Sequence, residues 1–235
     1  MRIADVGTGT GIWLRDVADI LPVTCQLDGF DISDAMFPSK TVLPANVTFR
    51  RQNLLEKFPD DYLGKYDVVN VRVMVVALSF DEWEPAVRNL MTLLRGYLQW
   101  VDCAAHEALV KGAANGKPPF NAEHYLELFR LIANVFGKTP KVAALHSIFQ
   151  KSRLEACEEY IYPLINPDSL EDVNAAVIDG IQNILTAALE IRELDWVRSK
   201  DQILKLKEAA LRDLHNHQCW YCYDVYVVIG RNSQG

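Results

Sequence analysis

The sequence predicts an α/β fold with a doubly wound, mostly parallel sheet. Over the first hundred residues, short apolar runs alternate with segments of helical period, which is typical of parallel strands joined by helices. A glycine-rich turn joins the first apolar run to the first helical segment. In the second half, two long helical segments precede a last aromatic and β-branched run, so we expect a helical insertion before a final antiparallel strand.

The first half predicts five strands and two helices. The run at 66–71 is apolar enough to be buried on both faces, as in a parallel sheet. Asp81 is a plausible N-cap for the second helix. We expect strands over 3–6, 27–32, 47–51, 66–71 and 96–101, and helices over 12–21 and 81–94.

The second half predicts an insertion that is mainly helical. Asn121 is expected to cap a helix, and 152–156 to close a further one before a strand. No internal repeat or linker is visible, so we expect a single domain over 1–235, with the helical insertion at about 170–215. The expected elements are helices over 121–136, 170–193 and 200–215, and strands over 157–162 and 219–229.

Composition excludes several classes of protein. The chain has 235 residues, half of them hydrophobic, which is enough for one sizeable core. A net charge of −7 without a cluster of Lys and Arg argues against nucleic acid as a partner. Five scattered cysteines do not form a disulfide framework, and no signal peptide is visible, so we expect a cytoplasmic protein. No apolar run reaches the roughly 18 residues that a membrane span requires.

The stretch "DVGTGTG" is the strongest indication of a ligand site. Gly7, Gly9 and Gly11 allow a tight turn and let a ligand approach bare backbone. The free N–H groups at the following helix start favour an anionic group. Twenty residues after Gly11, Asp31 ends the second expected strand, where a carboxylate can accept both hydroxyls of a ribose. The alternative is a strand–helix turn that binds nothing.

The glycine spacing is G-x-G-x-G rather than the G-x-G-x-x-G form that binds a pyrophosphate. Asp5 also precedes the first glycine, and its carboxylate suits a ligand with a cationic amino group. S-adenosylmethionine carries a ribose, an amino acid and a sulfonium, and it has no phosphate. These features together favour that cofactor over a dinucleotide.

Four stretches carry a resemblance to a known family: "IADVGTGTGIWLRDVA", "LDGFDIS", "LGKYDVVNVRVM" and "GYLQW". In this order they resemble the class I S-adenosylmethionine-dependent methyltransferases, especially the subgroup of fungal secondary metabolism. The resemblance covers roughly residues 2–102. It implies a Rossmann-like fold, with a cofactor-binding half at 1–102 and a substrate-side half at 103–235. Members usually carry helices upstream of the first motif that cover the cofactor, so we expect an N-terminally short member.

The resemblance also implies the cofactor contacts. The first motif surrounds the methionine part of the cofactor, Asp31 holds the ribose, and Ile32 packs on the adenine. In the third motif, "RRQNLLEKFP", the family often has an acidic residue where this chain has Asn53, whose amide oxygen can accept the same hydrogen bond. The implied contacts are Asp5, Gly7, Thr8, Gly9, Gly11, Asp31, Ile32, Asn53, Leu54, Asn70 and Arg72.

The sequence indicates the catalytic residue less clearly than the cofactor contacts. Methyl transfer is an in-line displacement that orientation alone can promote, but an oxygen acceptor also needs a general base. His106, shortly after the fifth expected strand, is our candidate base, with His124 and His146 as alternatives. Each of the three could instead be a surface or core histidine.

Two further features of the sequence could belong to a site. "HNHQCWYC" contains four possible metal ligands, but Cys219 and Cys222 would point to opposite faces of a strand, so we expect no metal. Trp100, at the end of a strand, could line an aromatic acceptor pocket or belong to the core.

We therefore predict methyl transfer from S-adenosylmethionine to an oxygen, nitrogen or carbon atom of a small-molecule secondary metabolite. Two alternatives stay open: a pericyclase-like enzyme that binds the cofactor without transferring its methyl group, and a regulatory or degenerate methyltransferase-like protein. We expect no nucleic-acid or membrane partner, and the sequence leaves a homodimer open.

Overall fold

The computed structural model describes residues 1–104, 109–112, 123–136, 141–163, 170–191, 197–216 and 219–232. The chain divides into two compact units, which are described separately. Unit 1 comprises Met1–Cys103, Lys141–Ile161 and Tyr226–Gly235, and unit 2 comprises Ala104–Pro140 and Tyr162–Val225. The expectation of a single domain stays a prediction.

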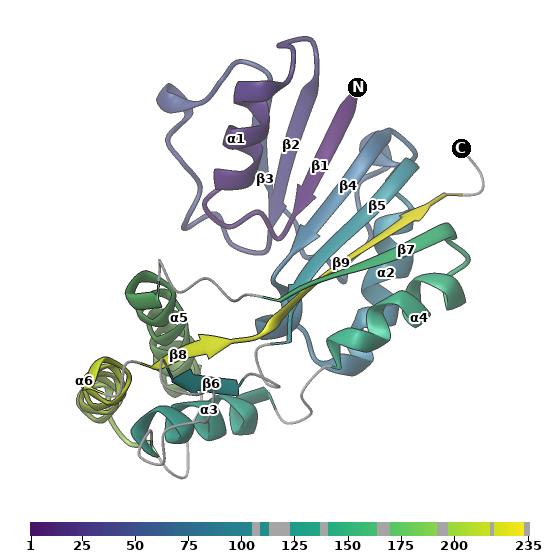
Figure 1. Ribbon diagram of the computed structural model, residues 1–235. Helices are drawn as coiled ribbons and strands as arrows, with labels where there is room; N and C mark the ends of the chain where they lie inside the picture. Colours follow the sequence, from purple (N-terminus) through teal and green to yellow (C-terminus); the bar gives the residue numbers. More distant parts are fainter. Residues whose placement is uncertain are drawn as a thin grey trace. The chain divides into compact units, whose positions relative to one another are not determined.

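Unit 1 is built on a seven-stranded sheet in the order β3-β2-β1-β4-β5-β9-β7 (Figure 1). β1, β2, β3, β4 and β5 pair in parallel with their neighbours, as predicted. β1 lies between β2 and β4, so the strand order reverses at β1, and ligands of such sheets bind beside the carboxyl ends at this switch point. The strands are β1 Arg2–Val6, β2 Gln26–Asp31, β3 Val47–Arg51, β4 Tyr66–Arg72, β5 Leu94–Cys103, β7 Glu155–Pro163 and β9 Asp224–Arg231.

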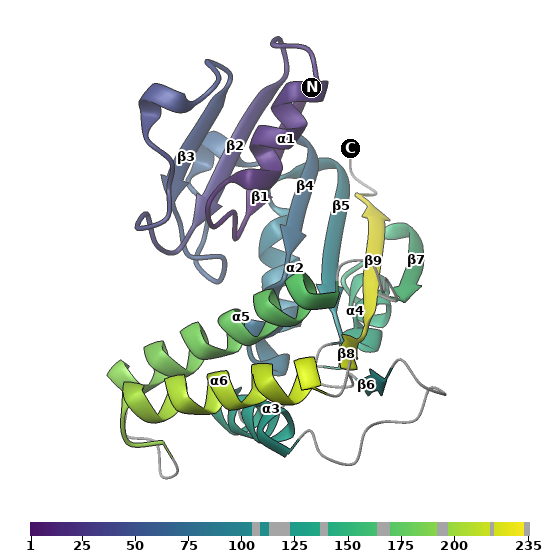
Figure 2. The same ribbon diagram turned by 60° about the vertical axis from the view of Figure 1, so that its left-hand side comes forward.

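The predicted final strand over 219–229 is two strands. β8, Cys219–Cys222, pairs antiparallel with β6, Leu109–Gly112, in a separate two-stranded sheet. β9 then joins the main sheet and runs opposite to β4 (Figure 2). The antiparallel final strand is confirmed, but its length was wrong, because Tyr223 separates two segments that pair with different partners. β6 was not predicted from the sequence.

The helices of unit 1 are α1 Ile12–Ile20, α2 Trp83–Met91 and α4 Leu145–Lys151. α1 packs on the first three strands through a cluster formed by Leu14, Ile3, Leu27 and Val47.

Two predicted helix boundaries were wrong. The second helix is shorter than 81–94, because a capping box of Ser79 and Glu82 starts a 3₁₀ turn ahead of it and β5 already begins at Leu94. Residues 152–156 do not close a helix, since α4 ends at Lys151 and a left-handed Arg153 leads into β7.

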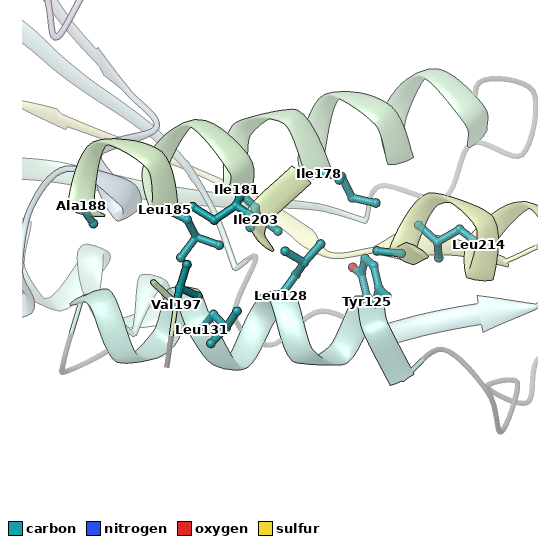
Figure 3. Packing of buried hydrophobic residues seen from close by; sticks show 11 residues of the cluster. Tyr125, Leu128, Leu131, Ile178, Ile181, Leu185, Ala188, Val197, Ile203 and Leu214 are labelled. Carbon is teal, nitrogen blue, oxygen red and sulfur yellow. The ribbon is translucent and has the colours of Figure 1, made fainter. Parts of the chain in front are cut away.

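Unit 2 contains the predicted helical insertion. Its helices are α3 Glu123–Phe136, α5 Leu170–Ile191 and α6 Lys200–Asn216. Each helix buries residues three, four or seven positions apart, so one apolar stripe per helix faces a shared core. Figure 3 shows this core, which includes Tyr125, Leu128, Leu131, Ile178, Ile181, Leu185, Ile203 and Leu214. Among the helices that the structure describes, none is both long and apolar enough to cross a bilayer.

A buried carboxylate connects four strands of unit 1 through their side chains. Asp28 on β2 is 2% exposed and accepts hydrogen bonds from Arg2 at 2.8 Å, Thr48 at 2.6 Å and Tyr66 at 2.9 Å. The Arg2 guanidinium also lies over the Tyr66 ring, 4.7 Å from its centroid. The charge of Asp28 is therefore paired and fully hydrogen-bonded, as a buried charge must be.

Replacing Asp28 by alanine is expected to lower the free energy of unfolding by roughly 3 kcal/mol, because it leaves Arg2 and Tyr66 without their acceptor. Denaturant unfolding would measure the change. Asp60→Ala is the control, since Asp60 pairs with Lys57 at the surface, and no measurable change is expected there. An Asp28→Ala variant as stable as the wild type would contradict the assignment.

Candidate active site

The ends of β1 and β2 meet at the glycine loop. The N–H groups of Gly7 and Thr8 donate to the Phe30 carbonyl at 2.8 and 3.0 Å, and the N–H of Gly9 donates to the Asp31 carboxylate at 2.8 Å. The loop that follows β1 is therefore attached to the carboxyl end of β2. This contact places the two motifs that suggested a ribose-containing ligand beside each other.

All three loop glycines are required by backbone conformation. Gly7, Gly9 and Gly11 have φ values of 73°, 56° and 68°, a region that other residues rarely adopt. A Cβ on Gly7 would lie 2.3 Å from the Met74 side chain, and one on Gly11 would lie as close to the Phe49 ring. A Cβ on Gly9 would meet nothing within 4 Å. At Gly9 the bare backbone therefore faces open space that a ligand can enter.

Asp5 lies beneath this loop and not at its surface. It is 1% exposed, and its two carboxylate oxygens accept hydrogen bonds from Thr8 and Asn70, each at 2.7 Å. Gln99 on β5 in turn donates to the Asn70 side chain at 2.8 Å. Burial raises the pKa of Asp5, and the hydrogen bonds from Thr8 and Asn70 oppose this shift. A direct contact between Asp5 and a ligand stays a prediction, since both oxygens already have protein donors.

Asp31 has the accessibility that Asp5 lacks. It is half-buried, and besides Gly9 it accepts the N–H of Ser33 at 3.1 Å. A carboxylate has about four lone-pair sites, so Asp31 can still accept two hydroxyls. Ile32, the next residue, is 60% exposed and offers an apolar surface beside this carboxylate.

Asn53 and Leu54 form a local turn after β3. The Asn53 amide oxygen accepts the N–H of Leu55 at 3.0 Å, which leaves one lone pair for a ligand. Leu54 is 7% exposed, and its carbonyl accepts a hydrogen bond from Asn89 at 2.6 Å. Both residues therefore also stabilise this turn, a role that the sequence did not reveal.

At the end of β4, Arg72 faces α1. Its guanidinium carbon lies 5.8 Å from the ring centroid of Trp13, in the first turn of that helix. Its Nε is buried and has no hydrogen-bond acceptor among the residues that the structure describes. Val73 follows with φ 57°, which is rare for a β-branched residue and shows that the surrounding structure imposes this turn.

Asp102 is a residue that the sequence analysis missed. Its carboxylate accepts the N–H groups of Met74, Val75 and Cys103 and the indole N–H of Trp100, at 2.8 to 3.1 Å. It thereby holds the strained turn after β4 against the end of β5. Burial raises its pKa to about 6. The only signal in the sequence was an acidic residue inside an aromatic and β-branched run, "YLQWVD".

The role of each predicted histidine stays a prediction. His106 lies outside the described residues. His124, on α3, contacts Asp213 at 3.0 Å, and His146, on α4, lies 3.3 Å from the Cys157 carbonyl.

The remaining candidates are Trp100 and the possible metal ligands near residue 219. Trp100 is fully buried, so its interpretation as pocket lining was wrong and the core alternative is confirmed. His217 and the side chains of Cys219 and Cys222 lie outside the described residues. Among the described residues, no group of three potential metal ligands occurs.

The raised pKa of Asp102 predicts a pH dependence of stability. The folded protein binds this proton more tightly than the unfolded chain, whose aspartate titrates near 3.8. The contribution of Asp102 to stability therefore falls as the pH rises from about 4 to 7, by about 3 kcal/mol. Denaturant unfolding of the wild type and of Asp102→Asn between pH 4 and 7 would test this prediction. The difference between their free energies of unfolding should change by about 3 kcal/mol over that pH range. A pH-independent difference would contradict the raised pKa.

Comparison with known proteins gives the family. A family model described as a methyltransferase domain matches residues 3–96. The chain is 30% identical over 246 residues to methyltransferase grgD from Penicillium sp, covering 99% of this chain and 83% of that protein. It is 24% identical to N-methyltransferase gliN from Aspergillus fumigatus, covering 86% and 73% of the two chains.

A solved structure supports the fold. It is that of phosphoethanolamine N-methyltransferase 2 from Haemonchus contortus, in complex with phosphomonomethylethanolamine and S-adenosylhomocysteine. The TM-score is 0.53 at 13% identity, and the match covers 99% of this chain and 49% of that one. Sequence relatives and fold therefore agree, and the chain belongs to the class I S-adenosylmethionine-dependent methyltransferases, with S-adenosylmethionine as its cofactor.

Proposed function

We propose that this methyltransferase transfers the methyl group to a nitrogen atom of a small secondary metabolite, at the carboxyl ends of β1, β2 and β4. The observation that carries the proposal is the hydrogen bond between Gly9 and Asp31, because it joins the glycine loop and the second-strand carboxylate into one site. The chain's fungal relatives support the substrate class, and the names of two of the compared proteins support nitrogen.

The residues at this site fit the cofactor. The open space at Gly9 allows close approach to the backbone. Asp31 keeps lone pairs for the ribose hydroxyls, Ile32 presents an exposed apolar face for the adenine, and Asn53 keeps one acceptor position for the adenine amino group. The end of β4 at Asn70 and Arg72 would then lie beside the amino-acid part and the reacting methyl group.

When bound, the cofactor supplies a sulfonium-activated methyl group as the electrophile. The chain's contribution is to fix its position, and orientation of the reacting atoms accounts for much of the rate of such an in-line displacement. Thr8 and Asn70 are themselves fixed by the buried Asp5, so the floor of the site is preorganised. A preorganised floor reduces the cost of ordering the bound cofactor.

A nitrogen acceptor agrees with the polar groups found at this site. A neutral amine attacks with its own lone pair, whereas a hydroxyl requires a base to take its proton. In the described part of the chain, Asp5 accepts a hydrogen bond from Asn70 of β4 and Asp102 accepts hydrogen bonds from the turn after β4, and both carboxylates are buried with every oxygen hydrogen-bonded. His106 remains the candidate base for an oxygen acceptor.

Asp31→Ala is expected to weaken the binding of S-adenosylhomocysteine at least tenfold, about 1.4 kcal/mol, because the ribose hydroxyls lose their acceptor. Calorimetric titration would measure the affinity. Asp34→Ala is the matched control, because Asp34 is exposed in the following loop and its side chain forms no hydrogen bond with the residues that the structure describes. Equal affinity in the wild type and Asp31→Ala would remove Asp31 from the site.

The acceptor atom can be tested with labelled S-adenosylmethionine and a panel of fungal metabolites in matched pairs. Each pair comprises a compound with a free N–H and the same compound already methylated on that nitrogen. We expect mass spectrometry to find label only in the N–H member. Label in both members, on oxygen or carbon, would overturn the nitrogen assignment while leaving methyl transfer intact.

A further inference from the structure

A cavity of about 580 Å³ lies in unit 1 between the ends of two helices. Its volume is within the range of cavities that hold small organic ligands. The last turns of α2 and α4, which contact each other, form its walls together with the residue that follows β9 (Figure 1). Three cationic side chains line it, with no carboxylate among the described lining residues: Arg88, Lys151 and Arg153.

This cavity lies at the opposite end of the sheet from the glycine loop. Thr92 precedes β5, and Asn232 is bonded to the first residues of that strand. The Asn232 side-chain amide donates to the Leu94 carbonyl at 2.6 Å, and its N–H donates to the Gly96 carbonyl at 2.8 Å. Because β5 runs parallel to β4 and β4 to β1, these residues lie at the amino ends of the strands. A ligand in the cavity would therefore leave the proposed cofactor site free.

The charged groups around the cavity are accessible. Lys151 and Arg153 are exposed, and neither forms an ion pair with a residue that the structure describes. Arg88 pairs with Glu84 on the same helix, yet its side chain is 66% exposed. The whole chain has a net charge of −7. A cavity lined by three cations and no carboxylate is therefore not explained by an excess of basic residues.

A purely structural role for these cations would be to offset the negative ends of the two helix dipoles. However, carbonyls in the last turns of α2 and α4 already accept backbone N–H groups at 2.9 to 3.2 Å. Both helices are thus closed by main-chain hydrogen bonds. The dipoles account for a cation in the last turn of each helix, Arg88 and Lys151, but they do not account for Arg153 beyond the end of α4.

The backbone of Arg153 adopts a conformation that usually requires glycine. Its φ is 67°, its N–H donates to the Gln150 carbonyl at 3.0 Å, and the N–H of Leu154 donates to the Phe149 carbonyl at 3.2 Å. These two bonds form a Schellman motif, in which glycine commonly occupies the left-handed position. Arginine there introduces strain that glycine would avoid. Such strain is typical of positions where function requires the side chain.

We propose that Arg88, Lys151 and Arg153 bind a phosphate group, either as inorganic phosphate or as the phosphate ester of a small metabolite. A phosphate ester carries a charge of about −1.5 to −2 at pH 7 and three acceptor oxygens, so it engages several cations at once. A guanidinium fork matches two of those oxygens, and an ammonium group acts as a point charge. Met91 lines the same cavity and offers apolar surface to an organic part. The inference is independent of the cofactor site, because it uses none of its residues.

Calorimetric titration at low ionic strength would compare inorganic phosphate, ribose 5-phosphate and ribose, which lacks the phosphate. The three variants are Arg153→Gly, Lys151→Gln and Arg88→Gln. Arg212→Gln is the matched control for Arg88→Gln. Arg212 also pairs with a glutamate four positions earlier, and its side chain is 65% exposed, but it lies on α6.

We expect the wild type to bind both phosphates and not ribose. Arg153→Gly and Lys151→Gln should each weaken phosphate binding at least tenfold, because each removes a charge-assisted hydrogen bond. Arg88→Gln should have a smaller effect, since Glu84 shares that guanidinium, and Arg212→Gln should have none. Arg153→Gly should not lower the thermal unfolding midpoint, because glycine adopts the left-handed backbone without strain. Its loss of binding is then not caused by misfolding.

The two phosphates identify the source of the group. Tighter binding of ribose 5-phosphate assigns a phosphorylated metabolite, and otherwise the ligand is inorganic phosphate. Failure of the wild type to bind either one, or binding that all three variants keep, would overturn the proposal. Competition between phosphate and S-adenosylhomocysteine would also overturn it, because the phosphate would then occupy the cofactor site.

Discussion

The site depends on the burial of one carboxylate. Asp5 is almost completely buried. A buried carboxylate is tolerated only when its oxygens are hydrogen-bonded. Its two donors come from the glycine loop and from β4, and Gln99 extends the chain of hydrogen bonds to β5. The requirement to satisfy Asp5 therefore fixes Thr8 and Asn70 with respect to each other. The loop above them is shaped before any ligand arrives.

Three buried aspartates of unit 1 hold neighbouring segments together through hydrogen bonds, whereas Asp31 remains available to a ligand. Asp28 connects the side chains of neighbouring strands, Asp5 supports the glycine loop, and Asp102 holds the turn after β4. Each has its oxygens occupied by protein donors. Asp31 is more accessible and retains lone pairs, so it is the carboxylate suited to a ligand. Burial and hydrogen-bond saturation thus separate carboxylates that organise the sheet from the one that can bind.

Much of the cofactor half could be predicted, because its signals are local. Glycines at alternate positions after an apolar run specify a strand–turn–helix, and all three indeed have positive φ. The strand at 47–51 was predicted residue for residue. The predicted 219–229 strand failed for a reason that local sequence does not contain. No Gly or Pro marks the change at Tyr223, and only pairing with distant partners divides the run into β8 and β9.

The roles of individual side chains were less predictable than the motifs. The expected contact between Asp5 and the ligand stays a prediction, but its hydrogen bond with Asn70, 65 positions further along the chain, was not predicted. Trp100 sits at a strand end, where a ligand-facing position was plausible, yet it packs on Trp83 and donates to Asp102. The buried Nε of Arg72, which has no acceptor among the described residues, could not be predicted either, because only the fold shows which acceptors are within reach.

The most direct test of this account is a crystal structure of the chain with S-adenosylhomocysteine. We predict the ribose hydroxyls on Asp31, the ligand beside the glycine loop, and both Asp5 oxygens still bonded to Thr8 and Asn70. An Asp5 carboxylate released from Thr8 and Asn70, or a ligand bound away from the ends of β1 and β2, would contradict it.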